Sequence, residues 1–388
     1  MVPLTMDQVV QAAGSSRARY LHLLSRLLLG EAAESSAPAL GHELQKLSDG
    51  DGEELSRFLA FADLHHVLVR SVEALQSSSI ETTIPGQSSP RFLNLRFSNR
   101  FSNQCAAALL QEQQRISQAL RVLQAVCDAL ESAECPATVI KSLDHWPDIG
   151  SDLDLYTNGS QEQIVSILRK QFSAEVQPRS WGDRLAQKWN FRLPGLSEAI
   201  EVHVGCLGQT GEHLNLARCV ANRSVRRTVG GHTFRAPAPE ERVLITTLQR
   251  MYRHFYCRLC DIVDTTKLIK AQELDYTILR AEAESSGIWP GVAAFLTTVA
   301  EYVRTYGVRL ELPAEVISSA TKGNALQLRG DFLRISIVPK AASLFLRQVL
   351  SAGTQKNLRT VSRLSLLPGL AAAAFVAYKI TGNDKGIW

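Results

Sequence analysis

The sequence has no strong excess of charge of either sign. Its 388 residues contain 42 Lys and Arg against 38 Asp and Glu, a net charge of +4 at pH 7. A balance this close to neutral disfavours long nucleic acid as the main partner, and any charged surface has to come from a local cluster. With 45% hydrophobic residues, the chain is expected to be globular and long enough for two or three domains.

Cysteine is scarce and forms no regular pattern. The seven cysteines are scattered, and the first residues, MVPLTMDQVVQAAG, lack the basic and then apolar pattern of a secretory signal. We therefore expect a cytoplasmic protein with reduced thiols. One closely spaced set, His254, Cys257 and Cys260, could place zinc ligands on one helix face, but no second ligand pair accompanies it, so a packed helix face is the preferred interpretation.

The common nucleotide-binding and hydrolase motifs are also absent. Neither a Walker A sequence nor GxGxxG occurs, which leaves P-loop and Rossmann folds without support. The sequence contains no serine-hydrolase elbow and no evident internal repeat. Any catalytic site has to be sought in another arrangement of residues.

Apolar residues at helical spacing predict that the first part of the chain is helical. They indicate helices over residues 6–29, 39–47 and 53–75. Residues 76–90 are rich in Ser, Thr, Pro and Gly, so a surface loop or linker is expected there. A longer helical pattern runs over residues 101–134 and ends before a proline, which cannot continue a helix.

Strand patterns follow that helix, and the second one carries two acids. Residues 137–140 are β-rich, and DLDLY, from Asp152, alternates polar and apolar residues. Leu153 and Leu155 then point to the core, while Asp152 and Asp154 share the other face. Neighbouring carboxylates repel unless a cation lies between them or a proton is retained, and Mg²⁺ is their usual partner. The spacing therefore predicts a metal site.

A third acid is expected beside this pair. KWNFRL and AIEVHV, residues 188–193 and 199–204, flank PGLS and are predicted to form two antiparallel strands. Glu201 and His203 share one face of the second strand. Metal-assisted polyphosphate chemistry needs a further carboxylate on an adjacent strand. Glu201 would hold a second metal, or it would take the proton of the group that accepts the transferred phosphate.

Taken together, these residues resemble the nucleotidyltransferase superfamily. The resemblance rests on a strand ending in Lys141-Ser142, the Asp-x-Asp strand ten residues later, and the acid-x-His strand. Within it the chain is similar to a bacterial group labelled uncharacterised nucleotidyltransferase, which resembles DNA polymerase beta in its catalytic core. The order of elements matches over roughly residues 60–310, including the late helical run RHFYCRLCDIVDTTKLI, whose Asp261 resembles a recurrent family acid that orients a neighbouring arginine.

The resemblance implies an α+β fold, a small mixed sheet with helices flanked by helical N- and C-terminal segments. It implies transfer of a nucleoside monophosphate from an NTP, such as ATP, to a hydroxyl group, with two Mg²⁺ ions. The implied catalytic and metal-binding residues are Asp152, Asp154 and Glu201. The implied phosphate-binding residues are Lys141, Ser142, Gly150 and Ser151, and His203 is an implied substrate contact.

The phosphate segment departs from the family pattern at Ser142, where the group has glycine. A small residue there lets backbone N–H groups approach the triphosphate, so the serine would have to serve through its hydroxyl and amide. Asp144 and His145 also stand where many relatives have an apolar helix. This departure motivates an alternative, a nucleotide-binding module without turnover.

The remaining expectations concern domains, partners and location. We expect a helical lead segment with its linker over residues 1–90, a catalytic core over 91–240 and a helical C-terminal domain over 241–388. The acceptor stays open among a small molecule, a sugar, a protein side chain and an RNA end. The basic run from Arg223 to Arg235 is interpreted as a solvated loop.

One apolar stretch raises the alternative of a membrane-associated partner in an envelope or polysaccharide pathway. The residues from Leu364 to Tyr378 are uncharged and lie between Arg363 and Lys379. Fifteen residues fall short of the roughly 20 that a spanning helix needs, so a buried terminal helix or a hairpin dipping into the interface fits better. The expectation is therefore a cytoplasmic protein, with contact at the membrane periphery as the alternative.

Overall fold

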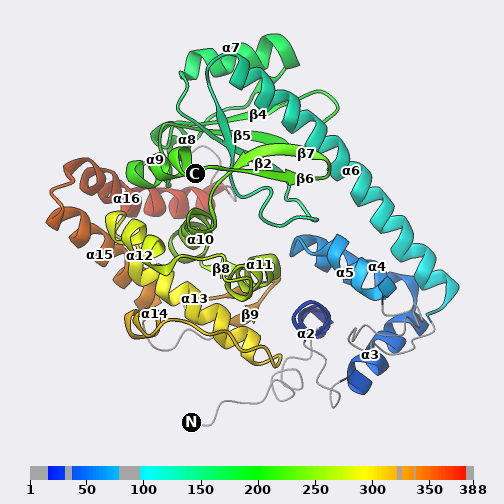
Figure 1. The fold of residues 1–388 in the computed structure, drawn as a ribbon. Helices are drawn as coiled ribbons and strands as arrows, with labels where there is room; N and C mark the ends of the chain where they lie inside the picture. The colour runs from blue at the N-terminus through cyan, green and yellow to red at the C-terminus, as the bar shows by residue number, and fades with distance from the viewer. Residues whose placement is uncertain (1–15, 31–36, 78–96, 321–325, 336–337, 382–388) are drawn as a thin grey trace.

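The computed structural model describes residues 16–30, 37–77, 97–320, 326–335 and 338–381. Figure 1 shows a sheet with covering helices in its upper part and a helical body below. This is the α+β architecture expected from the sequence, with small mixed sheets between helical terminal segments.

The main sheet has five strands in the order β1-β2-β5-β4-β3. The strands are β1 (Ala137–Val139), β2 (Asp152–Thr157), β3 (Glu175–Val176), β4 (Lys188–Arg192) and β5 (Ala199–Val204). β2 and β5 pair in parallel, and the other neighbours pair antiparallel. The two acid-bearing patterns in the sequence therefore become adjacent strands.

Two helices shield the apolar face of this sheet. They are α6 (Asn99–Ser132), which Figure 1 shows as the long cyan helix, and α7 (Gln161–Phe172). Leu153 and Leu155 are fully buried in the same core as Leu120 and Leu123 of α6. The side-chain oxygen of Ser160 accepts a hydrogen bond from Gln163 N at 3.1 Å and caps α7. The predicted long helix and the alternating strand are confirmed.

Four helices precede the long helix α6 in the chain: α2 (Ser16–Leu29), α3 (Ala37–Asp49), α4 (Gly52–Leu64) and α5 (Leu68–Ser77). The single helix predicted over 53–75 is wrong, because the chain turns at His66, whose φ is +52°. His65 is buried there: its Nδ1 accepts from Leu259 N at 3.0 Å and its Nε2 donates to Asp331 O at 2.9 Å. Residues 6–15 of the first predicted helix and the linker at 78–90 lie outside the described residues.

The short helix α8 (Trp181–Leu185) lies between β3 and β4 in the chain. The helical body follows the sheet and comprises α9 (Leu214–Asn222), α10 (Pro239–Thr247), the π-helix η1 (Leu248–His254), α11 (Leu259–Lys270), α12 (Tyr276–Ser285), α13 (Trp289–Arg304), α14 (Ala314–Ser319), α15 (Val338–Thr354) and α16 (Leu358–Thr381). A small sheet joins β8 (Tyr256–Cys257), β9 (Gln327–Arg329) and β10 (Phe332–Arg334).

The first helices and this helical body share one hydrophobic core. Ser25 of α2 and Tyr302 of α13 form a buried hydrogen bond of 2.7 Å although 277 positions separate them in the chain. Figure 1 shows α2 beside the helices of the body. The expected domain limits at residues 90 and 240 stay a prediction.

Two local predictions for the middle of the chain are wrong. The basic run expected to be a loop forms a hairpin of β6 (Val225–Val229) and β7 (His232–Ala236). Arg223, just before it, pairs with Glu240 and Glu241. The zinc or helix-face set is divided among three elements, because His254 ends η1, Cys257 lies on β8 and Cys260 on α11.

The apolar stretch near the C-terminus is one continuous helix, α16, with Pro368 inside it. The window Leu358–Ala377 has a mean hydropathy of 1.5, and only 17% of it is buried. It is the one helix among the described residues long and apolar enough to cross a membrane by length and composition. The expectation of a buried helix, or of a hairpin formed within Leu364–Tyr378, is therefore wrong.

Candidate functional site

The parallel pairing of β2 and β5 brings three acids together. Asp154 lies opposite Glu201 in the register of the two strands, and Asp152 lies two residues earlier on the same face of β2. We call Asp152, Asp154 and Glu201 the acid face. The sequence pattern predicted this grouping, because a period of two places the acids opposite the buried Leu153 and Leu155.

Three cationic or polar side chains hold the acid face in place. Lys141 Nζ lies 2.5 Å from Asp154 Oδ1 and 3.8 Å from Glu201 Oε1. Lys188 Nζ lies 3.1 Å from Glu201 Oε2, and His203 Nε2 donates to Glu201 Oε1 at 2.8 Å. The predicted substrate contact His203 is buried, so in this structure it orients Glu201.

The pKa values of the acids reflect these neighbours. Burial alone would raise the pKa of Glu201, but Lys141, His203 and Lys188 together hold it well below the usual value. The pKa of Asp152 is raised by desolvation and then by the negative charges of Asp154 and Glu201, although its side chain reaches solvent. A carboxyl group whose pKa is raised by neighbouring carboxylates marks a place where a bound cation would be stabilised.

The loop after β1 explains the unusual serine. Lys141 is the residue with a left-handed backbone, φ +63°, whereas Ser142 does not have a positive φ. The Ser142 hydroxyl donates to Asp152 O at 3.1 Å and accepts from Asp154 N at 2.8 Å, and its amide donates to Ile140 O. Its hydroxyl and amide are thus engaged in positioning β2, and neither is free to bind phosphate in this conformation.

The other predicted phosphate residues line the mouth of the same site. Gly150 and Ser151 border a pocket that also contains Lys141 and the acid face. A Cβ on Gly150 would come within 3.1 Å of His66 Cε1, so glycine allows the loop to pack closely on that ring. Ser151 is exposed, with its Oγ 3.5 Å from Asp152 Oδ2.

This pocket has a volume of about 220 Å³ and a second, cationic wall. The wall comes from η1, β8 and the start of α11, elements that follow the sheet in the chain. We call its three arginines, Arg250, Arg253 and Arg258, the arginine wall. Sequence reasoning missed it, and the signal that could have shown it is the run of closely spaced arginines in QRMYRHFYCRLC.

Two arginines of this wall, Arg250 and Arg253, differ in how firmly they are held. Arg250 is buried and its Nε lies 2.7 Å from Asp261 Oδ2, so the interpretation of Asp261 as an arginine-orienting acid is confirmed. Arg253 is exposed and pairs with no carboxylate in the described part of the chain. Burial and then the nearby arginines lower the pKa of His254 to about 3, which keeps it neutral.

Buried ion pairs fasten the loop between Lys141 and Asp152 to the helices. Arg70 of α5 binds Asp148 at 2.9 Å and Asp264 of α11 at 2.7 Å. His145 Nδ1 donates to the other oxygen of Asp264 at 2.7 Å. The polar residues Asp148 and His145 of this loop are therefore both paired, and the pairs tie the loop to α5 and α11.

A nearby cysteine and histidine do not form a nucleophilic site. His145 Nε2 lies 3.7 Å from the Cys260 sulfur, an arrangement that resembles a nucleophile with its base. Cys260 is fully buried, however, and burial raises the pKa of its thiol. A buried protonated thiol is unreactive, so this cluster is structural.

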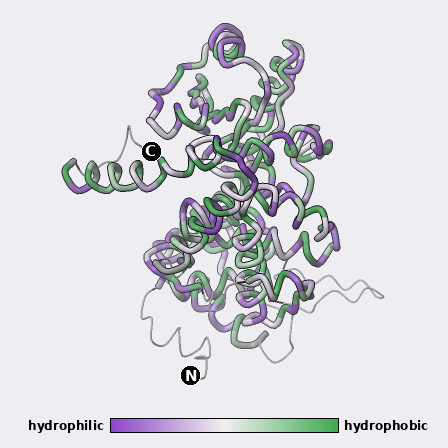
Figure 2. The backbone as a smooth tube through the Cα atoms, turned by 90° about the vertical axis from the view of Figure 1, so that its left-hand side faces the viewer, coloured by the Kyte–Doolittle hydropathy of each residue, from purple (hydrophilic) through white to green (hydrophobic). Residues whose placement is uncertain are grey.

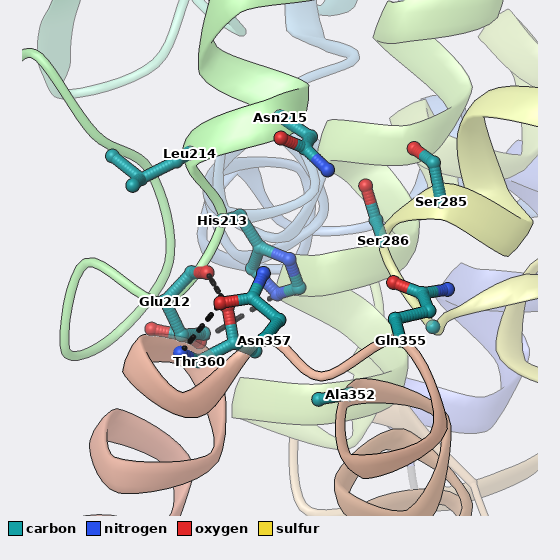
Figure 3. A pocket seen from close by; sticks show the side chains of 11 residues that line it. Glu212, His213, Leu214, Asn215, Ser285, Ser286, Ala352, Gln355, Asn357 and Thr360 are labelled. Carbon is teal, nitrogen blue, oxygen red and sulfur yellow. Dashed lines mark hydrogen bonds and ion pairs between the residues drawn. The ribbon is translucent and has the colours of Figure 1, made fainter.

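Another cavity lies between α9, α12 and the last two helices, lined by residues that include Glu212, His213 and Thr360 (Figure 3). Its volume is about 10 Å³, which is room for about one water molecule and far too small for a nucleotide. The candidate site is therefore the pocket between the acid face and the arginine wall.

A model of the family described as "Uncharacterised nucleotidyltransferase" matches residues 51–304, which include the whole pocket. The chain belongs to this nucleotidyltransferase family. One solved structure is also similar, an antigenic nucleotidyltransferase-like protein from Paracoccidioides brasiliensis, with 15% identity and a TM-score of 0.33. The similarity covers 53% of this chain and 98% of that one. No curated protein matches the sequence.

Proposed function

We propose that this nucleotidyltransferase moves a nucleoside monophosphate from an NTP to a hydroxyl group, with Mg²⁺ as cofactor, in the cytoplasm. The observation that carries the proposal is the pocket itself, in which the acid face on two adjacent strands shares one cavity with the arginine wall. Carboxylates suit a divalent cation and arginines suit phosphate oxygens. A metal-bound triphosphate needs both kinds of partner at once.

The residues present fit a divalent cation. Asp154, Glu201 and His203 each offer a ligand atom, and these atoms lie within 4.8 Å of one another. With Asp152 beside them the donors are mainly hard oxygens, as Mg²⁺ prefers, and the low pKa of Glu201 keeps it in the charged form that binds cations. When bound, the metal supplies charge neutralisation at the phosphate oxygens that develop negative charge.

The protein's own side chains would bind and orient the nucleotide. Arg253, which is exposed and unpaired by any carboxylate in the described residues, would bind phosphate oxygens of the nucleotide. Arg250, fixed by Asp261, adds a charge that is already oriented. Lys141 lies against Asp154 here, so in our proposal it turns toward the phosphates when a cation takes its place.

A nucleotide-binding module without turnover is the second candidate. It is favoured by the ion pair between Lys141 and Asp154, which occupies the place a cation would take, and by the engaged hydroxyl and amide of Ser142. Such a protein would bind NTP through the arginine wall without releasing pyrophosphate.

The test is transfer of label from an α-phosphate-labelled NTP to acceptors in a cell extract, with pyrophosphate release measured in parallel. Wild type would be compared with the double variant Asp152→Asn and Asp154→Asn. The control replaces two exposed acids far from the pocket, Asp49→Asn and Asp128→Asn. Mg²⁺-dependent transfer that is lost only in the first variant supports the proposal. NTP binding without transfer supports the second candidate, and no NTP binding at all contradicts both.

A further inference from the structure

The last two helices carry most of the large hydrophobic side chains that are exposed in the described chain. We call α15 and α16, which pack against each other, the C-terminal hairpin. Seven of the twelve large hydrophobic side chains exposed among the described residues belong to it: Leu346, Leu350, Leu358, Leu366, Phe375, Val376 and Ile380. Leu358 and Ile380 are 80% and 77% exposed, so they are almost fully in water. A patch of this kind indicates a docking surface.

The same hairpin carries charge of one sign. Between Val338 and Thr381 the sequence has six Lys and Arg and no Asp or Glu. The net charge of the chain is +4 and that of this segment is +6, so the rest of the chain has a net charge of −2. The nearly neutral composition therefore conceals a basic segment, of which Arg347, Lys356, Arg359 and Lys379 are exposed on the same two helices as the apolar side chains.

The hairpin is fastened to the body along α15, where Leu344 is buried in the core and Gln348 bonds to His213 at 3.1 Å, and at the start of α16. Thr360 Oγ1 donates to Glu212 O at 3.0 Å, and Arg363 Nη1 donates to Leu185 O at 2.7 Å. Figure 3 shows Thr360 beside Glu212 at the start of α16, and Figure 2 shows the helix next to the C-terminus mark projecting from the rest of the tube. The exposed side chains Phe375, Val376 and Ile380 belong to the C-terminal half of α16.

We propose that the C-terminal hairpin lies on the surface of a bilayer containing anionic lipids. Its apolar side chains would enter the headgroup region while its basic residues face the lipid phosphates. A lying helix fits better than a spanning one, because only 14 residues separate the anchored Leu364 from Lys379, against about 20 for a span.

A second copy of the chain is a weaker candidate for this surface. A two-fold contact would bring the same basic residues of both copies together, and the hairpin has no acid to pair with them. Anionic lipid satisfies the apolar and the basic side chains together. The inference does not depend on the transferase reaction.

The experiment is flotation of the full-length protein with vesicles of phosphatidylcholine alone and of phosphatidylcholine mixed with phosphatidylglycerol. We expect binding to the mixed vesicles, weakened by salt, and a loss of about tenfold or more in the variant Phe375→Glu plus Val376→Glu. The matched control is Leu110→Glu, which changes an exposed leucine of α6 and should bind as wild type does. Circular dichroism would verify that each variant is folded.

Four outcomes would overturn the proposal. The first is no binding to mixed vesicles, and the second is equal binding by wild type and the double variant. The third is equal binding to neutral and anionic vesicles, which would remove the role of charge. The fourth is resistance to alkaline carbonate, which would indicate a spanning helix. A concentration-dependent dimer that the double variant abolishes, without vesicle binding, would assign the surface to a second copy.

Discussion

Replacing Lys141 by methionine should reveal a competition between its ammonium group and a divalent cation. The Lys141 Nζ lies 2.5 Å from Asp154 Oδ1 and 3.8 Å from Glu201 Oε1, in the place where a shared cation would bind. Lys141→Met leaves the acid face with less positive charge and leaves space beside it. The variant should be less stable without metal and more responsive to metal than wild type.

The size of the effect follows from burial. Breaking a buried ion pair costs about 3–5 kcal/mol, and because the Lys141 and Asp154 side chains keep 15% and 11% of their exposure, we expect about 2–3 kcal/mol of lost stability. A cation present at about 100 times its dissociation constant stabilises a folded protein by about 2.7 kcal/mol. In wild type the cation has to displace the Lys141 ammonium group, which reduces the net stabilisation. Saturating Mg²⁺ should therefore stabilise the variant by more than it stabilises wild type.

The assay is urea unfolding with Mg²⁺ and with chelator. The matched control is Arg223→Met, which also removes one positive charge that pairs with two buried carboxylates, Glu240 and Glu241, away from the pocket. This control should lose stability with no change in its response to Mg²⁺. Equal stabilisation of wild type and Lys141→Met by Mg²⁺ would refute the competition, and an Mg²⁺ response that is absent from both would contradict the metal site.

Three further predictions concern the supports of the site. Ser142→Ala should cost about 1–2 kcal/mol in urea unfolding, because the serine hydroxyl bonds to the backbone of both aspartates of β2; an unchanged midpoint would contradict this. Arg70→Met should cost about 3–5 kcal/mol in the same assay, since the two buried carboxylates Asp148 and Asp264 would lose the guanidinium charge that they share; a loss below 1 kcal/mol, about the value of an exposed pair, would contradict it. Burial lowers the pKa of His65 to about 4, so the unfolded chain takes up its proton first and stability should fall as pH drops from about 6.5 toward 4. In His65→Gln the unfolded chain no longer takes up this proton. The free energy of unfolding should therefore change less steeply with pH in that range, by the equivalent of about one bound proton. An unchanged slope would show that His65 is already charged in the folded state.

The sequence predicted best those helices and strands in which a single spacing of apolar residues continues through the whole element. Alternation in DLDLY and AIEVHV predicted two strands with Asp154 and Glu201 directed away from the core, and the structure pairs these strands in parallel. The long helix over 101–134 was equally predictable, because its apolar spacing is uninterrupted. In both cases the pattern needs no knowledge of distant residues.

The missed features all depend on contacts between distant parts of the chain. The break at His65 escapes periodicity, because the apolar spacing continues across it and the reason for the turn is hydrogen bonding to Leu259 and Asp331. The arginine wall belongs to elements whose position opposite β2 is set by tertiary packing. The exposure of α16 was likewise hidden, since composition shows that a helix is apolar and does not show what covers it.

The core shared by the first helices and the helical body has a consequence during synthesis. The partners of α2 include α13, which ends at Arg304, so more than 200 residues must be made after α5 before this core can close. At about 5–20 residues per second that interval is roughly 10–45 s. The sheet core, drawn from residues up to Phe234, can form earlier. We therefore expect the sheet unit to fold while the chain is still on the ribosome and the apolar faces of the first helices are still exposed. A nascent-chain chaperone would bind to these exposed faces.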